Sequence, residues 1–353
     1  DEYLYAADYP SLVVYDVHDP LRSRSVAPVA LVQEQTTPTA TVALAQEQTS
    51  STYYGSFQDI QVAGNVLYLT GTKNGLSIVD ISDPRQPVVR GQYVEEDVRY
   101  SRVYVAETIA YLVGTSGYTS TFDIVDVSNP DNPALVGRYV YESSDAEADY
   151  HDVIASRRAV YVATDDGLNI FERSNPVSPT LYGEFNLPGV ARNMQLAGSL
   201  LYALSGEYGV SHLSILDVRD PFNPSVVSSY EIAGSVLDMQ VVDSIVYLAT
   251  GQGVLLIDAR VPTLPVSFER YEMPQARQLQ VVDELLYVRT LSDMHILAAQ
   301  TSSADPLSLV TLDGTSNATY ASDSFFKATV YPLSGALPVD YTWETSDGHT
   351  MVH

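Results

Sequence analysis

The sequence predicts an all-β fold, with a seven-bladed β-propeller over residues 1–300 followed by a partial β-sandwich over residues 301–353. Three observations lead to this prediction. A strand-turn-strand unit returns along the chain at regular intervals, a strand that contains a tyrosine precedes each copy, and apolar and polar residues alternate in the segments between them. A period of about 40 to 45 residues built only from strands is typical of propeller blades.

The repeated unit is clearest at residues 75–93, GLSIVDISDPRQPVVRGQY. The apolar run 76–81 favours a strand, and Asp83, Pro84 and Pro87 break it into a turn before a second strand. The acidic position of the unit recurs at Asp16, Asp80, Asp126, Glu172, Asp217 and Asp258, with Ala298 in a worn copy. The intervals between these positions are 64, 46, 46, 45, 41 and 40 residues. Seven marker tyrosines precede the copies and predict seven blades: Tyr5, Tyr68, Tyr111, Tyr161, Tyr202, Tyr247 and Tyr287.

The strand motif also carries a family resemblance. Its copies SIVDIS, at residues 77–82, and DIVDVS, at residues 123–128, resemble the LVIVD repeat, which gives its name to a family of bacterial and archaeal surface propellers. The resemblance covers roughly residues 1–300. It implies a propeller fold and a location outside the cell or on its surface.

The first predicted blade is incomplete. Because Tyr5 marks a second strand, this blade lacks its innermost strand, and either a later segment of the same chain or a neighbouring molecule could supply it. A hairpin insertion is expected at about residues 26–52, where VALVQEQT and VALAQEQT form a doublet on either side of Pro38.

The composition changes at about residue 301. Three strands are expected beyond this point, in PLSLVTLDG, FFKATVYP and PVDYTWETSDG, with Trp343 as a core anchor. Residues 307–312 within the first of these should also serve as the fourth strand of the seventh blade. The segment resembles the first half of an immunoglobulin-like or PKD-like domain, although residues 346–348 read Ser-Asp-Gly where PKD-like repeats have Gly-Asp-Gly. Asn317 begins Asn-Ala-Thr, a possible glycosylation site.

Composition excludes several classes of protein. Lys and Arg number 18 against 44 Asp and Glu, and the net charge of −26 would repel nucleic acid and anionic lipid. The chain contains no run of about 18 apolar residues that could span a membrane, and its first residues show no signal pattern, so we expect a mature soluble protein. The absence of cysteine excludes disulfides and thiolate chemistry. The 26 tyrosines, together with many Thr, Ser and Asn residues, favour an extracellular or cell-surface location.

Counting back nine residues from six of the marker tyrosines gives a polar residue on the innermost strand of each blade. We term these the belt residues: Asp59, Arg102, Asp152, Asn193, Asp238 and Gln278. An apolar residue follows each of them, so the alternation predicts belt side chains that face the channel. Two interpretations are open. We favour a hydrogen-bonded structural belt in which Arg102 balances carboxylates, and the alternative is a weak site for a small molecule or cation.

Catalytic chemistry is poorly indicated elsewhere. The acidic residue at each strand end should accept backbone N–H bonds in its turn rather than form a ring of carboxylates. The six histidines show no metal-binding spacing, only His151 lies on an innermost strand, and GxSxG, P-loop and GxGxxG motifs are missing. The acidic connector at residues 141–150 is favoured as a solvated loop over a divalent-cation site. We therefore expect no catalytic residue, no bound metal and no cofactor.

Three functional hypotheses remain. We favour a structural or interaction protein that assembles through β-strand contacts with copies of itself, as a homopolymer in a filament or surface layer. The second hypothesis is a surface module for adhesion or for binding a carbohydrate or protein ligand. The third, a hydrolase, has the least support because no suitable residue cluster is found.

Overall fold

The structure is a computed structural model of the chain. It describes residues 3–8, 11–16, 24–30, 57–71, 75–117, 119–142, 150–207, 209–273, 275–282, 285–290, 293–298, 309–315, 327–331, 342–344 and 350–352. Strands joined by turns account for this part of the chain, and it contains no helix long and apolar enough to cross a bilayer.

The chain divides into two compact units, Asp1–Tyr208 with His212–Val226, and Gly209–Ser211 with Val227–His353. The strands up to β17 lie in the first unit, and β18 and β19 each span the division. The first sheet has the order β1 (Tyr3–Asp8), β2 (Ser11–Asp16), β3 (Arg24–Ala30). The next two sheets contain β4 (Phe57–Ala63), β5 (Val66–Gly71), β6 (Gly75–Asp80), β7 (Val88–Tyr93), and β8 (Arg99–Ala106), β9 (Ile109–Ser116), β10 (Thr119–Asp126), β11 (Ala134–Glu142). Two more contain β12 (Asp152–Ala155), β13 (Ala159–Thr164), β14 (Gly167–Glu172), β15 (Leu181–Asn186), and β16 (Val190–Ala197), β17 (Leu200–Glu207), β18 (Val210–Asp217), β19 (Ser225–Ala233).

The second unit continues the same pattern. One sheet has the order β20 (Val236–Val242), β21 (Ile245–Thr250), β22 (Gly253–Asp258), β23 (Val266–Glu272). The next has five strands, β24 (Gln278–Val282), β25 (Leu285–Arg289), β26 (Asp293–Ala298), β27 (Leu309–Thr315) and β28 (Lys327–Tyr331). β29 (Thr342–Glu344) and β30 (Thr350–Val352) form a separate two-stranded sheet.

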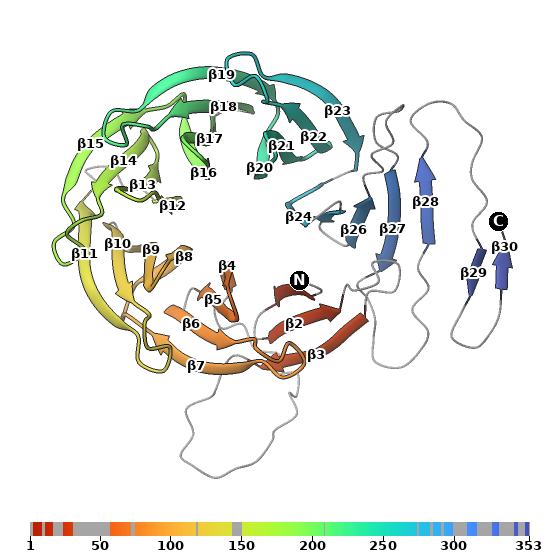
Figure 1. Cartoon of the computed structure of the whole chain (residues 1–353), viewed down its shortest axis with the longest axis horizontal. Helices are drawn as coiled ribbons and strands as arrows, with labels where there is room; N and C mark the ends of the chain where they lie inside the picture. The colour runs from red at the N-terminus through yellow and green to blue at the C-terminus, as the bar shows by residue number, and fades with distance from the viewer. Residues whose placement is uncertain are drawn as a thin grey trace, which may run out of the picture. The chain divides into compact units, whose positions relative to one another are not determined.

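The sheets of the first unit follow one another along an arc in sequence order (Figure 1). β4, β8, β12 and β16 lie on its inner side and β7, β11 and β15 on its outer side, as strands do in propeller blades. The predicted all-β propeller arrangement is confirmed. The predicted count of seven blades is wrong: the structure has five blades, which are β4–β7, β8–β11, β12–β15, β16–β19 and β20–β23 and have four strands each. The β1 sheet has only three strands, and the meander from β24 continues to a fifth.

The middle strands of each blade form the core. In β6 all residues but the last are buried, because a strand inside a stack of blades is covered on both faces. Such strands read as nearly continuous apolar runs, which is why SIVDIS and its copies stand out in the sequence. Most of the marker tyrosines are buried here: Tyr68, Tyr111, Tyr161, Tyr202 and Tyr287.

The outer strands share a bulge that the sequence analysis did not detect. In β7, β11, β15 and β23 the register with the preceding strand shifts and leaves one residue unpaired: Arg90, Val136, Tyr182 and Phe268 respectively. A bulge bends the strand and redirects a side chain. In β7 and β11 a glycine follows, and a Cβ atom on Gly91 or Gly137 would overlap the carbonyl oxygen of Pro130 or Pro176. The outer strand of one blade therefore touches the proline turn of the next.

The expectations for the two ends of the chain need correction. β3 already includes residues 26–30 of the predicted insertion, and the rest of the insertion lies outside the described residues. β27 pairs with β26 as the fourth strand of its sheet, as expected for residues 307–312. The predicted sandwich strand in FFKATVYP becomes β28, which pairs with β27 and extends the same sheet. β28 therefore does not complete the first blade. Trp343 lies in β29, but its side chain and Asn317 are outside the described residues.

Candidate functional site

All six belt residues lie on the first strand of their sheets: Asp59 on β4, Arg102 on β8, Asp152 on β12, Asn193 on β16, Asp238 on β20 and Gln278 on β24. Shifts in register immediately precede Asp59, Arg102, Asn193 and Asp238. Such shifts mark bulges, which bend a strand locally. Asp152 begins its strand in regular register with β13.

The belt carboxylates bind the backbone of the next blade. An oxygen of Asp59 accepts the N–H of Val103 at 2.9 Å, an oxygen of Asp152 accepts the N–H of Met194 at 2.7 Å, and one of Asp238 accepts the N–H of Leu279 at 2.9 Å. The other oxygen of Asp152 and of Asp238 accepts the N–H of the following residue, each at 2.9 Å. In each case the partner N–H belongs to the residue after the next belt residue. The three belt aspartates therefore link neighbouring innermost strands.

Glutamines two positions after the belt residues add a second link. The Gln61 side chain accepts the N–H of Val105 at 2.6 Å and donates to the Val105 carbonyl at 3.3 Å. Gln240 accepts the N–H of Val281 and donates to the Val281 carbonyl at 3.4 Å. A primary amide thus satisfies both polar groups of one residue of the neighbouring strand, as another strand would.

Asp59, Arg102 and Asp152 share one electrostatic environment. Burial raises the pKa of Asp152 to about 7, the positive charge of Arg102 opposes this rise, and the negative charge of Asp59 adds to it. Burial also raises the pKa of Asp59, against the effect of Arg102. Arg102 itself donates to the Ser101 carbonyl at 3.0 Å. Gln278 accepts from Arg289 at 3.0 Å, so this belt residue pairs within its own sheet.

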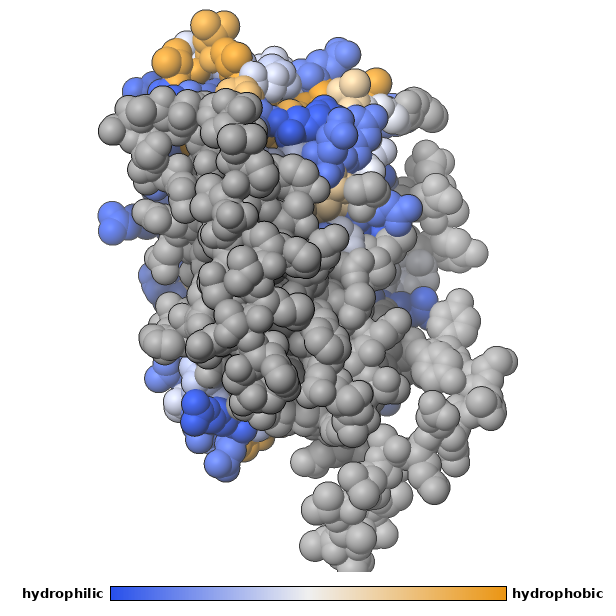
Figure 2. Space-filling view, turned by 90° about the vertical axis from the view of Figure 1, so that its right-hand side faces the viewer, coloured by the Kyte–Doolittle hydropathy of each residue, from blue (hydrophilic) through white to orange (hydrophobic). Residues whose placement is uncertain are grey.

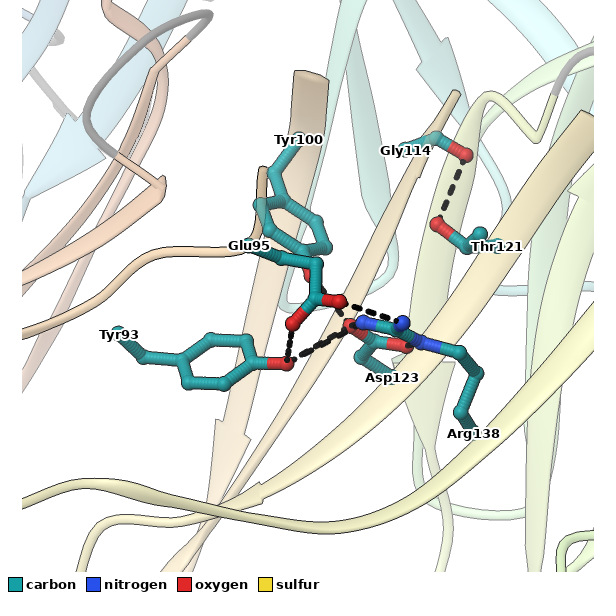
Figure 3. Close-up of polar contacts among 7 residues, drawn as sticks. All are labelled: Tyr93, Glu95, Tyr100, Gly114, Thr121, Asp123 and Arg138. Carbon is teal, nitrogen blue, oxygen red and sulfur yellow. Dashed lines mark hydrogen bonds and ion pairs between the residues drawn. The ribbon is translucent and has the colours of Figure 1, made fainter. Parts of the chain in front are cut away.

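A second polar cluster joins the β4–β7 and β8–β11 blades (Figure 3). Asp123, on β10, is fully buried and lies between Tyr93, Tyr100 and Arg138. Its Oδ2 atom accepts from the Tyr93 hydroxyl at 3.2 Å, from the Tyr100 hydroxyl and from Arg138 at 2.7 Å, and its Oδ1 atom accepts from Arg138 Nε at 2.7 Å. Arg138 also binds Glu95 at 2.9 Å. We call these five residues the Asp123 cluster.

The charges of the Asp123 cluster fix its protonation. Burial, then the Asp123 charge, raises the pKa of Tyr93 to about 12 and raises the pKa of Tyr100 further. The hydrogen bond from Arg138 lowers the pKa of Glu95, and Asp123 raises the pKa of Arg138. Both tyrosines therefore remain neutral donors at neutral pH. The cluster holds two blades together, and it offers no nucleophile or free base.

Three segments of the chain, residues 54–95, 102–140 and 149–187, match the LVIVD repeat family. The chain carries LVIVD repeats. The first and third matches span β4–β7 and β12–β15, and the second begins within β8 and ends within β11, so each LVIVD repeat corresponds to one blade. No curated protein matches the sequence.

Several solved structures share the fold of this LVIVD-repeat chain. The periplasmic gluconolactonase PpgL of Pseudomonas aeruginosa is 9% identical, with a TM-score of 0.68 over 87% of this chain and 94% of that chain. A functionally unknown protein from Desulfotomaculum acetoxidans DSM 771 is 11% identical, with a TM-score of 0.65 over 84% and 92%. The computationally designed Ika8 protein is 9% identical, with a TM-score of 0.57 over 89% and 91%. Identities this low indicate a shared fold alone.

The acidic position of the LVIVD strand has the structural role that its turn predicts. Asp80, Asp126, Asp217 and Asp258 each accept the backbone N–H of the residue two positions later, at 2.8 to 3.0 Å. Hydrogen bonds from the turn lower the pKa of all four, that of Asp258 to about 2. These residues close turns, as expected, and do not converge on a ligand.

The remaining candidates give no metal centre in the described part of the chain. His151 Nε2 lies 2.7 Å from Asp165 Oδ1, between the first and second strands of their blade. No group of three or more His, Asp or Glu side chains there could hold a metal ion. The acidic connector at residues 141–150 lies largely outside the described residues, so the alternative of a cation site there stays a prediction.

The Asp123 cluster is the main feature that sequence reasoning missed. Asp123 stands in the repeated strand at a position that Ser77 and Asn169 occupy in other blades, and all three are buried. The charge of Asp123 within a mostly apolar strand could have predicted such a cluster, because a buried carboxylate requires hydrogen-bond or charged partners.

Proposed function

We propose that the protein is an extracellular or cell-surface structural and interaction protein that assembles with copies of itself, as a subunit of a filament or surface layer. The observation that supports this proposal is the use of the belt. The carboxylates of Asp59, Asp152 and Asp238 bind backbone N–H groups of the next blade. These three carboxylates, which could have formed part of a channel site, join blades instead, so interaction through the outer surface is the better-supported role.

The proposal includes the two irregular sheets. The β1–β3 sheet has three strands where each of the five blades has four, and the sheet from β24 to β28 has five. A three-stranded blade exposes a hydrogen-bonding edge at β1, and a strand from a neighbouring molecule would cover this edge by β-strand addition. Repetition of such a contact between copies produces an open assembly.

The test is the association state of the full chain. The net charge of −26 keeps copies apart at low ionic strength, and salt screens this repulsion. Sedimentation velocity over a range of protein and salt concentrations should show assemblies that grow with both, and negative-stain images should show filaments or lattices. A monomer under all conditions would refute the proposal.

A specific aromatic contact favours a second candidate, a surface module for carbohydrate or protein ligands. Tyr182 is exposed on β15 and its ring lies 4.4 Å from that of Phe222, while Arg158 lies over the Phe222 ring at 5.2 Å. An exposed tyrosine in contact with a second ring presents an apolar face to a ligand, and an arginine beside it adds polar groups. Tyr182→Ala should abolish binding to a glycan array if this candidate is right, and an array without wild-type signal would count against a carbohydrate ligand.

A further inference from the structure

The turn before β23 and the start of that strand form an apolar surface. Val261, Leu264, Val266 and Phe268 are exposed by 58%, 69%, 52% and 46%. We call these four residues the β23 patch. The turn before β23 lies at the top of Figure 1. Figure 2 views the molecule from the right-hand side of Figure 1 with the same end at the top, and apolar residues lie along that upper edge. Exposed apolar side chains that gather in one place mark interaction sites more often than isolated ones do.

β23 differs from the other outer strands in how it is covered. Its first three residues, Val266, Ser267 and Phe268, are all exposed, so both faces of the strand are open there. In β15 the residues on either side of Tyr182 are partly buried. β23 is also the last strand in the order of its sheet, which leaves its outer edge available for backbone pairing.

Contacts between the outer strand of one blade and the turn of the next blade indicate what an outer strand binds. The bulged residue of β7, Arg90, pairs with Asp131 in the turn of the next blade, and the ring of Tyr182, the bulged residue of β15, contacts that of Phe222 in the next turn. Phe268 is the equivalent residue of β23, and 46% of it is exposed. The bulged position is thus a contact site in two other blades, and in β23 it presents an exposed aromatic ring.

Charge indicates which partner can fit. Residues 261–268, VPTLPVSF, carry no charge in a chain whose net charge is −26. Two copies repel each other through most of their surfaces, and the repulsion is weakest where both present an uncharged apolar surface. The same surface on a second copy meets this condition, and burial of the four side chains favours the contact.

We propose that the β23 patch binds the same patch on a second copy of the chain, in a contact with two-fold symmetry. The proposal rests on the self-association proposed above and names one of its surfaces. Antiparallel pairing of the two β23 edges would join two blades into one continuous sheet. A two-fold contact makes pairs of molecules, and the strand exchange at the β1 edge would link the pairs.

The test compares Leu264→Asp with Val177→Asp in the full chain. Both side chains are 69% exposed and lie in the turn between the third and fourth strands of a blade, so the variants match in exposure and in added charge. Sedimentation velocity should show that Leu264→Asp weakens the pairing at least tenfold and that Val177→Asp does not. If the two variants have equal effects, or if neither affects a protein that assembles, the proposed pairing through the β23 patch is wrong while the proposed self-association stands. A wild-type monomer would overturn both.

Single cysteines provide a second measurement, since the chain has none of its own. Ser267→Cys places a thiol on the exposed part of β23, and Ser229→Cys places one at an exposed position of the outer strand β19. A short bismaleimide should link two copies of Ser267→Cys into a covalent dimer, because a two-fold contact brings equivalent residues together. Crosslinking of Ser229→Cys to the same extent would refute the proposal. This assay decides the matter if the Leu264→Asp variant fails to fold.

Discussion

Removal of Arg138 should cost far more stability than removal of Arg90, although the two arginines make the same kind of bond. Arg138 binds Asp123 through two hydrogen bonds of 2.7 Å. Arg90 binds Asp131 through two of 2.7 and 2.8 Å. Both arginines lie on outer strands. The difference is burial, since the Asp123 side chain is 0% exposed and that of Asp131 is 54% exposed.

The magnitude follows from what the substitution leaves behind. In Arg138→Met, the Asp123 carboxylate would keep only the hydroxyls of Tyr93 and Tyr100 as donors, without a compensating charge. Breaking a buried ion pair in this way costs about 3 to 5 kcal/mol of unfolding free energy. We expect the lower end, since a quarter of the Arg138 side chain reaches solvent. In Arg90→Met, water replaces the lost partner of Asp131, and the change should be close to the error of measurement.

Urea unfolding followed by far-ultraviolet circular dichroism measures both variants. A third variant, Asp123→Asn, tests the pair from the other side, and the double substitution should cost less than the sum of the single ones. Equal losses for Arg138→Met and Arg90→Met would refute the argument from burial.

Two further predictions concern the contacts between blades. Gly137→Ala should lower the melting temperature, because the added Cβ would overlap the Pro176 carbonyl. In Gly183→Ala the Cβ meets nothing within 4 Å, so this change should be neutral or stabilise the protein by up to about 1 kcal/mol. Equal melting temperatures of the two variants would contradict this reasoning. The raised pKa of Asp152, about 7, means that the folded state binds this proton more tightly than the unfolded state, so its contribution to stability falls as pH rises from about 4 to 7. Asp152→Asn should therefore gain on the wild type across this range, by at most about 1.4 kcal/mol per pH unit, and parallel stability curves for the two proteins would show that the residue does not titrate there.

The blade pattern could be predicted because it repeats. A strand covered on both faces is mostly apolar, and the turn after it favours residues such as Asp83 and Pro84. Each blade therefore shows the same sequence pattern, an apolar strand followed by a turn. Counting from the marker tyrosines placed all six belt residues on the first strands of their sheets. The register of antiparallel strands preserves such a count along each hairpin.

The partners of these residues could not be predicted in the same way. Asp59 binds Val103 and Asp152 binds Met194, contacts between blades that depend on how sheets stack. The bulges before the belt residues and in the outer strands also leave no clear pattern in the sequence. The blade count failed at the ends, where strand number depends on which segments pair. Leu309–Thr315 and Lys327–Tyr331 follow the last repeat with strand-like sequences, and pairing with β26 extended that sheet instead of starting a sandwich.

The links between innermost strands run in one direction. Asp59 and Gln61 contribute side chains, while Val103 and Val105 contribute only backbone groups. Any residue except proline supplies the same N–H. The hydrogen bond therefore places no demand on the receiving side chains, which are all buried and apolar but differ as Val103, Met194 and Leu279. A duplicated blade could be inserted into such a series without a matching change in the blade that receives it, so this architecture gives a simple route for blades to multiply and then diverge.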